Sequence, residues 1–466
     1  MTAQPRIGLL PLYLELYDRV RPEARPNMEA FAQRVADRLS AGGLVVERAP
    51  ICRLEAEVRS ALGVLLARDV DLLATLHLAY SPSLESADVL AGLGLPLLLL
   101  DTTPAQCFAE QATSDDLFHN HGIHGVQDLA CVLRRCERTF FLAVGHVDNP
   151  VFLQEAVGVA RAACTSRRLR GMKVLVLGDE FTGMGDFAVE PEVLDHALGL
   201  SIERVPVAEL GARCHHLSEK DVAVEARIDA ERFDTTGLSP SILNDSNRVG
   251  LALRALLEER RAGAFSFNFQ SFDRRAGVPT VPFLEASKAM ARGIGYAGEG
   301  DALTAALVGA LLHGFGDTTF TEMFCPDWEG GSVFMSHMGE CNPALAAGRP
   351  KLVEKPYAFG DVDNPAIALF ALEPGPATLV NIAPGPRDSL ELLAARVQVL
   401  DRGPQPGFPD VPHFWLEPVD LDLPEFLRRY SEAGGTHHLA LIKGEHMESI
   451  AALAAMLGLK AILLGK

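Results

Sequence analysis

The sequence predicts an α/β protein that starts with doubly wound parallel sheets and ends in a domain of β or mixed character. Three observations predict this fold class. Short apolar runs alternate with amphipathic ones over residues 1–165, a second such unit starts at Lys173, and shorter strands separated by Pro- and Gly-bearing segments follow Thr321. A length of 466 residues is enough for two or three domains.

The first region contains the clearest alternation of strands and helices. Strands are predicted at residues 7–14, 44–48 and 71–77, helices at 27–42 and 58–69, and a fully buried strand at the apolar run 95–100. Such an alternation builds a parallel sheet with helices on both faces.

Three histidines follow this region, among glycines and before a predicted helix: His119, His121 and His124. Their spacing permits a metal site, but the same spacing is common in loops. We favour a loop that faces the substrate, because imidazoles form good hydrogen bonds with hydroxyl groups.

The second unit opens with the run KVLVLGD from Lys173, which predicts a buried strand. The Gly-rich segment GDEFTGMGD that follows is not GxGxxG, so the dinucleotide-binding fingerprint is absent. Residues 264–272 alternate aromatic and polar side chains, which predicts a half-buried strand that includes Phe269. Strands of a C-terminal, barrel-like domain are predicted at residues 379–383, 394–400 and 413–416.

Charge and composition exclude several classes of partner. A formal net charge of −19 argues against nucleic acid, whose phosphates need basic patches. The first apolar run lacks the basic flank of a signal peptide, and the longest one, residues 89–100, is too short to span a bilayer. The cysteines form no CxxC pair, so neither a zinc ribbon nor a disulfide framework is indicated. We therefore expect a cytoplasmic protein with no nucleic-acid or membrane partner.

A stretch rich in candidate ligands covers residues 293–340. Glu299 lies in a Gly-rich turn before an apolar, helix-like run, where the positive end of the helix favours an ionised carboxylate. Glu322 stands between two phenylalanines, and a carboxylate among aromatic side chains is costly unless it is paired or metal-bound. His337 and Glu340 follow in a mostly apolar run.

Structural roles remain open for several of these residues. Glu299 could interact only with the helix dipole, and a lone histidine such as His337 is more often a hydrogen-bonded core residue. Near the C-terminus, His437 and His438 follow two glycines. Adjacent side chains of an extended segment point to opposite faces, so only one of these two is expected to face a metal.

Two carboxylates and one or two histidines together make a ligand set of oxygen and nitrogen atoms. Such a set suits Mn²⁺, Fe²⁺ or Zn²⁺ at a catalytic centre. A divalent ion held in this way polarises a carbonyl and an adjacent hydroxyl, while one glutamate moves the carbon-bound proton and the other moves the hydroxyl proton. That chemistry interconverts an aldose and a ketose through an enediol.

Four segments carry a resemblance to a known family. YAGEGDALTAAL around Glu299, FTEM around Glu322, SHMGE around His337 and GGTHH ending at His438 are similar to motifs of the L-arabinose isomerase and L-fucose isomerase superfamily, with detail closer to the arabinose branch. The resemblance implies that the two glutamates are catalytic. It also implies that all four residues hold Mn²⁺ or another divalent cation, with His438 favoured over His437.

The resemblance has further implications for substrate and assembly. Weaker matches imply substrate contacts at His121, His124, Phe269 and His437. The family organisation implies Rossmann-like domains at residues 1–170 and 171–320 and a C-terminal barrel at 321–466 that completes the metal site. It also implies a sugar substrate and a trimer-based homo-oligomer, such as a hexamer, whose active site borrows N-terminal residues of a neighbour.

The residues expected to contact the sugar depart from the family pattern. The family's glutamine ahead of the substrate histidine is His121 here, its arginine and glutamate after that histidine are Gln127 and Asp128, and its Glu-Asp-Leu is QSF at residues 270–272. We therefore expect the isomerase chemistry with a pentose or hexose whose identity is open. The alternatives are a metal-dependent sugar epimerase and a non-catalytic sugar-binding protein of the same fold.

Overall fold

The computed structural model describes residues 3–465. Ala3–Arg167 form one compact unit, here called the N-terminal unit, and the chain from Arg168 onward belongs to a second one, here called the C-terminal unit. The boundary falls near the end of helix α7 (Pro150–Leu169).

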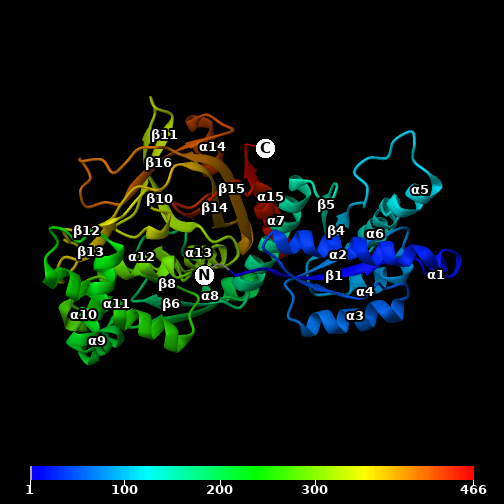
Figure 1. Cartoon of the computed structure of the whole chain (residues 1–466). Helices are drawn as coiled ribbons and strands as arrows, with labels where there is room; N and C mark the ends of the chain where they lie inside the picture. The colour runs from blue at the N-terminus through cyan, green and yellow to red at the C-terminus, as the bar shows by residue number, and fades with distance from the viewer. Residues whose placement is uncertain (1–2, 466) are drawn as a thin grey trace. The chain divides into compact units, whose positions relative to one another are not determined.

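The N-terminal unit is built on a five-stranded parallel sheet in the order β2-β1-β3-β4-β5. Its strands are β1 (Arg6–Leu12), β2 (Val45–Arg48), β3 (Leu72–His77), β4 (Leu97–Asp101) and β5 (Phe141–Val144). The leucine-rich β3 and β4 are almost completely buried, as expected of a sheet covered on both faces. Helices α2 (Arg25–Ala41) and α3 (Glu55–Ala67) lie on opposite faces (Figure 1). The predicted doubly wound sheet is confirmed.

The histidine-bearing stretch is helical, so the predicted loop is wrong. Helix α5 (Ser114–Asn120) contains His119, His121 follows its last residue, and His124 lies in the first turn of α6 (Ile123–Arg135). The shorter helices α1 (Glu15–Val20) and α4 (Ala87–Ala91) complete the unit.

Close packing explains the glycines that suggested a loop there. A Cβ atom at Gly122 would lie 2.4 Å from the carbonyl oxygen of His77, and one at Gly125 would lie 2.5 Å from the hydroxyl oxygen of Ser81. These glycines let α6 approach the end of β3, so they serve helix packing instead of loop flexibility.

The C-terminal unit begins with a four-stranded parallel sheet in the order β7-β6-β8-β9. Its strands are β6 (Lys173–Leu177), β7 (Ser201–Val205), β8 (Ala264–Phe267) and β9 (Gly295–Gly298). The strand predicted over residues 264–272 is confirmed only for residues 264–267, and the predicted half-burial is wrong. All four residues of β8 are buried, and a 3-10 turn follows it at Phe269–Ser271, because the side chain of Asn268 accepts a hydrogen bond from the backbone of Gln270.

Six antiparallel strands then form a closed barrel, which confirms the predicted C-terminal domain. The order is β14-β17-β10-β11-β16-β15, and the pairing of β14 with β15 closes the ring. Its strands are β10 (Thr318–Asp327), β11 (Ser332–Ser336), β14 (Gly375–Pro384), β15 (Leu390–Val399), β16 (His413–Pro418) and β17 (His438–Lys443). The parallel strand β18 (Lys460–Leu464) extends β15, and β12 (Lys351–Glu354) pairs separately with β13 (Ala366–Leu369).

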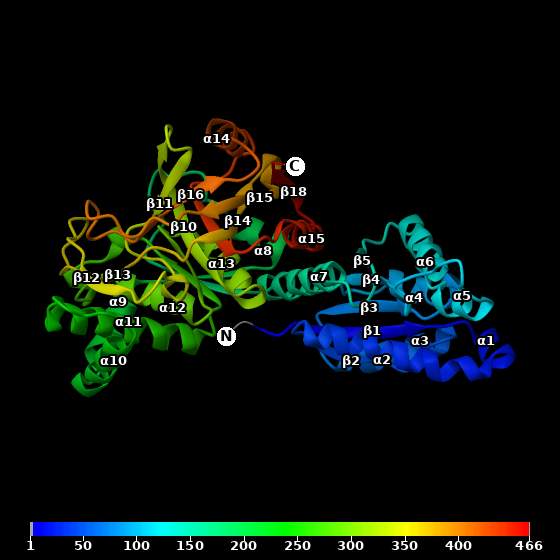
Figure 2. The same ribbon diagram turned by 45° about the horizontal axis from the view of Figure 1, so that its top comes forward.

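Helix α13 (Ala302–Gly314) lies between the parallel sheet and the barrel of this unit (Figures 1 and 2). Nearly all of its residues are buried, and a helix that is apolar on every side is stable only in such a position. The remaining helices are α8 (Pro191–Leu198), α9 (Val207–His216), α10 (Glu219–Arg232), α11 (Pro240–Arg260), α12 (Phe283–Ala291), α14 (Leu423–Glu432) and α15 (Met447–Leu457). No helix within residues 3–465 combines the length and hydrophobicity needed to cross a bilayer.

Candidate metal centre

Glu299 lies on a tight turn directly after β9. Its backbone N–H donates to the carbonyl oxygen of Phe267 at 2.9 Å, and its own carbonyl accepts from the N–H of Phe181 at 3.0 Å. Its φ of +65° is uncommon for a residue with a side chain. The next residue, Gly300, has φ +93°, and a Cβ atom there would lie 2.8 Å from Cα of Glu180. The surrounding backbone therefore fixes the position of the Glu299 carboxylate.

His438 is the first residue of β17 and is fully buried. Its Nδ1 lies 3.1 Å from Oδ2 of Asp301, whose other oxygen accepts from the backbone of Thr304 and caps α13. If Nδ1 carries the proton and donates it to Asp301, Nε2 carries no proton and presents a lone pair. Nε2 has no hydrogen-bond partner among the described residues and lies 3.6 Å from Oε2 of Glu299. A buried nitrogen left in this way is costly unless it coordinates an ion.

His337 follows β11 and is held in the same manner. Its Nδ1 lies 2.8 Å from Oε2 of Glu340, whose second oxygen accepts from the hydroxyl group of Tyr296. Burial alone would lower the pKa of His337, but the charge and hydrogen bond of Glu340 raise it overall. A Cβ atom at Gly298 would lie 2.7 Å from Nε2 of the ring, so this glycine leaves room for the imidazole.

The register of the barrel brings Glu322 to these rings. Glu322 of β10 lies opposite His438 of β17 and opposite Ser336, which precedes His337. Directly opposed side chains share a face of the sheet. Ligand atoms of Glu322, His337 and His438 lie within 4.8 Å of one another, and those of Glu299, His437 and His438 do too. The structure therefore brings the four predicted ligands together, and their metal-binding role stays a prediction.

Both rings of the histidine doublet approach Glu299, and the expectation that only one of them faces a metal stays a prediction. Strand β17 starts at His438, so His437 precedes it and the alternation of a strand does not apply. The two ring centroids lie 4.3 Å apart, and Nε2 of His437 is 3.7 Å from Oε2 of Glu299. Burial alone would lower the pKa of His437, but the hydrogen bond with Asp186 and the nearby Glu299 carboxylate raise it to about 10.

Aromatic rings surround the imidazoles. Phe320 meets His337 and His438 edge-to-face, with ring centroids 4.8 and 5.0 Å apart. Phe187 stacks on His438 at 5.0 Å, with the ring planes 5° apart. These contacts restrict the orientations of the two imidazole rings.

The expected substrate-binding residues are divided between the two units. Phe269 is buried in the C-terminal unit, where its ring lies 5.9 Å from that of Phe181, next to the Glu299 turn. His121 and His124 belong to the N-terminal unit, where Nε2 of His121 contacts the hydroxyl group of Tyr17 at 3.2 Å. Their substrate contacts stay predictions.

Sequence reasoning gave no role to four residues that support the site: Asp186, Phe187, Asp301 and Glu340. Asp301 stands directly before a helix, and Glu340 stands three residues after a candidate ligand, so local signals existed for both. Asp186 and Phe187 lie in the Gly-rich segment after β6, where no local motif marks them.

The site contains more acid than the protein neutralises. The five carboxylates are Asp186, Glu299, Asp301, Glu322 and Glu340. Among the described residues, none of the five forms an ion pair with lysine or arginine, and the ion-pair partners of Asp186, Glu299, Asp301 and Glu340 are histidines. A divalent cation fits this donor set and would supply the missing positive charge.

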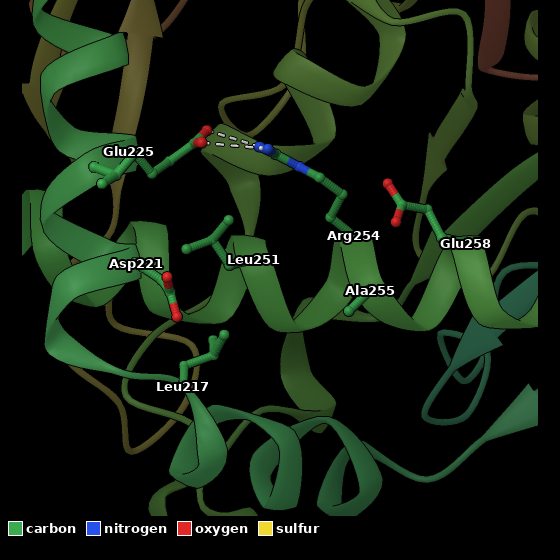
Figure 3. A pocket seen from close by; sticks show the side chains of 8 residues that line it. Leu217, Asp221, Glu225, Leu251, Arg254, Ala255 and Glu258 are labelled. Carbon is green, nitrogen blue, oxygen red and sulfur yellow. Dashed lines mark hydrogen bonds and ion pairs between the residues drawn. The ribbon is translucent and has the colours of Figure 1, made fainter.

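A separate cavity of about 380 Å³ lies between α10 and α11 (Figure 3). It is lined by Leu217, Asp221, Val224, Glu225, Leu251, Arg254, Ala255 and Glu258. Arg254 points to Glu225 and donates two hydrogen bonds to it, at 2.7 and 3.2 Å. The cavity contains none of the predicted site residues.

Comparison with known proteins identifies related chains. The family model for the L-arabinose isomerase central domain matches residues 188–313, and the model for the L-arabinose isomerase C-terminal domain matches residues 317–460. The chain is similar to the L-arabinose isomerase of a Nocardioides species, at 28% identity over 95% of this chain and 90% of the relative. The L-arabinose isomerases of Acidothermus cellulolyticus and Serratia proteamaculans are 27% and 25% identical, over 93% and 95% of this chain and 89% and 91% of the relatives.

Proposed function

Because the chain belongs to the L-arabinose isomerase family by its central and C-terminal domains, we propose that it is a metal-dependent aldose–ketose isomerase acting on a pentose or hexose. One observation carries the metal dependence. The buried Nε2 of His438 lacks a partner and faces Glu299 in a cluster of carboxylates that pair with no lysine or arginine among the described residues. A sugar-binding protein has no need for two acids around an ion, so the arrangement favours an enzyme.

Glu299, Glu322, His337 and His438 would hold Mn²⁺ or another divalent cation, which polarises a sugar carbonyl and the adjacent hydroxyl when bound. Burial raises the pKa of Glu299, but the neighbouring imidazoles lower it overall, so the carboxylate is ionised at neutral pH. Glu299 takes the proton from the hydroxyl-bearing carbon of the aldose and returns it to the neighbouring carbon. Glu322 relays the hydroxyl proton, so an enediol connects aldose and ketose.

The family resemblance also supports the finer parts of the proposal. These are a central domain over residues 171–320, a barrel domain over 321–466, and a cytoplasmic, trimer-based homo-oligomer. In such an assembly, His121 and His124 of one copy would contact the sugar bound to a neighbour. The departures at Gln127, Asp128 and residues 270–272 leave the identity of the pentose or hexose open.

Proton NMR in D₂O tests the proposal on the Mn²⁺-loaded protein with a panel of aldopentoses and aldohexoses. We expect one aldose to yield a ketose that carries deuterium at the exchanging carbon. An epimeric aldose with deuterium would identify an epimerase, and a ketose without deuterium would favour a hydride shift. Binding of a sugar without any product would overturn the enzymatic proposal.

A further inference from the structure

We infer that Asp186 is a positioning residue that acts through His437, holding its ring so that Nε2 faces Glu299 and the substrate. The inference rests on the proposed function for its catalytic meaning. The geometry of the contact carries it, independently of which sugar is bound.

A single oxygen of Asp186 holds two donors of the same histidine. Its Oδ2 accepts from the backbone N–H of His437 at 3.0 Å and lies 2.6 Å from Nδ1 of the ring. These two bonds fix the side chain relative to its own backbone. A flip of the ring would place a carbon atom against the carboxylate, so Nε2 stays directed toward Glu299, 3.7 Å from its Oε2.

The segment that carries Asp186 is anchored on both sides of it. Before it, the N–H of Phe181 donates to the carbonyl oxygen of Glu299 at 3.0 Å. After it, Phe187 stacks on His438 at 5.0 Å. Asp186 is thus fixed relative to both the catalytic carboxylate and the candidate metal ligand, as positioning requires.

The two histidines of the doublet each have a carboxylate partner at Nδ1, but their rings differ in solvent exposure. Each has a carboxylate at Nδ1, Asp301 for His438 and Asp186 for His437. The side chain of His438 is fully buried, whereas that of His437 is 30% exposed. The buried ring therefore suits an ion, and the accessible ring suits a sugar hydroxyl beside Glu299.

Kinetics of Asp186 variants test the role in the full-length, Mn²⁺-loaded protein. We expect Asp186→Ala to lower kcat at least tenfold, with KM within threefold and Mn²⁺ affinity within twofold of the wild type, because misplaced substrate contacts slow the reaction. Asp186→Asn keeps an oxygen that accepts both bonds, so it should recover most of the loss. Asp195→Ala serves as the control, because this exposed carboxylate on α8 makes no side-chain hydrogen bond or ion pair among residues 3–465.

A double-mutant cycle separates positioning from a general structural effect. In a His437→Ala background, Asp186→Ala should have no further effect on kcat, because the residue through which it acts is gone. An equal loss in both backgrounds, or full activity of Asp186→Ala, would overturn the inference.

An NMR measurement that needs no turnover tests the positioning role of Asp186 independently of the proposed function. In ¹⁵N-histidine-labelled full chain in metal-free buffer, we expect a downfield Nδ1 proton signal that disappears in both His437→Gln and Asp186→Ala. Its persistence in Asp186→Ala would refute the positioning role even if the protein is an isomerase. A wild type that shows the signal but converts no sugar would refute the isomerase proposal alone.

Discussion

The C-terminal unit contains two clusters of charged side chains that are built in opposite ways. Between α10, α11 and α12, three cations face three carboxylates in what we call the ionic cluster: Arg254, Lys288 and Arg292 with Glu225, Asp229 and Glu285. The candidate metal centre has five carboxylates and three histidines, without a lysine or arginine partner among the described residues.

The difference shows what each cluster contributes. In the ionic cluster, the fork of Arg254 binds Glu225 and Glu285 through two hydrogen bonds each, so the buried charges are neutralised inside the protein. In the candidate metal centre, the fold leaves negative charge and the Nε2 atom of His438 uncompensated. Removing a charge should therefore cost stability in the first cluster and function in the second.

The largest effect is expected for Glu299→Gln in the candidate metal centre. Turnover should fall by roughly 10⁴-fold, about 5 kcal/mol of transition-state stabilisation, because an amide neither accepts the carbon-bound proton nor binds a cation as a carboxylate does. The free energy of unfolding without metal should fall only slightly, because the ionised carboxylate, whose pKa the neighbouring imidazoles lower, interacts favourably with them in the folded protein. Kinetics and urea unfolding measure the two quantities, with Glu329→Gln on the exposed β10–β11 turn as the control. Wild-type turnover in the variant would refute the acid–base role of Glu299.

Lys288→Met should have the next largest effect, this time on stability. The Lys288 ammonium group is buried and binds Glu225, Asp229 at 2.8 Å and Asn247 at 3.3 Å. Methionine fills a similar volume but leaves two buried carboxylates short of a cation, so the free energy of unfolding should fall by about 3 kcal/mol. Urea unfolding measures the loss, and Lys220→Met on the exposed face of α10 should change little. A loss of turnover without a loss of stability would contradict the comparison.

The sequence allowed prediction of the features that depend on local patterns. The alternating sheets and the barrel-like C-terminal domain follow from periodicity within short runs. Glu299 stands out because glycines flank it, and Glu322 stands out because it lies between two phenylalanines. Such signals need only a few neighbouring residues.

The remaining features depend on contacts between distant parts of the chain. Asp186 acquires its role from His437, which is 251 residues away in sequence, so no local motif could reveal it. The orientation of the histidine doublet depends on β17 starting at His438, and a shift of one residue would reverse which ring faces the barrel strands. The glycines at the start of α6 are needed because the helix packs against the end of β3, and this contact cannot be read from the sequence of α6 alone.

Lowering the pH should reduce the free energy of unfolding through the ionic cluster, because Glu225 has a lowered pKa in the folded protein. Burial raises this pKa, but the hydrogen bonds from Arg254 and the charge of Lys288 lower it to about 2, from an ordinary value of 4.5. Because the folded pKa lies below the unfolded one, the contribution to stability is complete above pH 4.5 and is lost as pH falls toward 2, by roughly 2 kcal/mol at pH 3.

Urea unfolding between pH 6 and 3 measures this pH dependence. Glu225→Gln should flatten it, whereas Glu258→Gln, on the exposed rim of the same cavity, should leave it unchanged. Equal slopes for the wild type and Glu225→Gln would show that other acids dominate the response.

Gly298→Ala should produce the smallest effect, and it acts on the metal centre alone. The added Cβ atom would lie 2.5 Å from Cε1 and 2.7 Å from Nε2 of His337, whose other nitrogen is held by Glu340, so the ring must shift away from its present position. We expect the affinity for Mn²⁺ to fall about tenfold, roughly 1.4 kcal/mol, with less than 1 kcal/mol change in the free energy of unfolding without metal. Calorimetric titration with Mn²⁺ measures the affinity. Gly63→Ala in α3, where an added Cβ atom meets nothing within 4 Å, is the matched control. Unchanged Mn²⁺ binding in Gly298→Ala would remove His337 from the ligand set and leave the unpaired nitrogen of His438 as the remaining argument for an ion at this site.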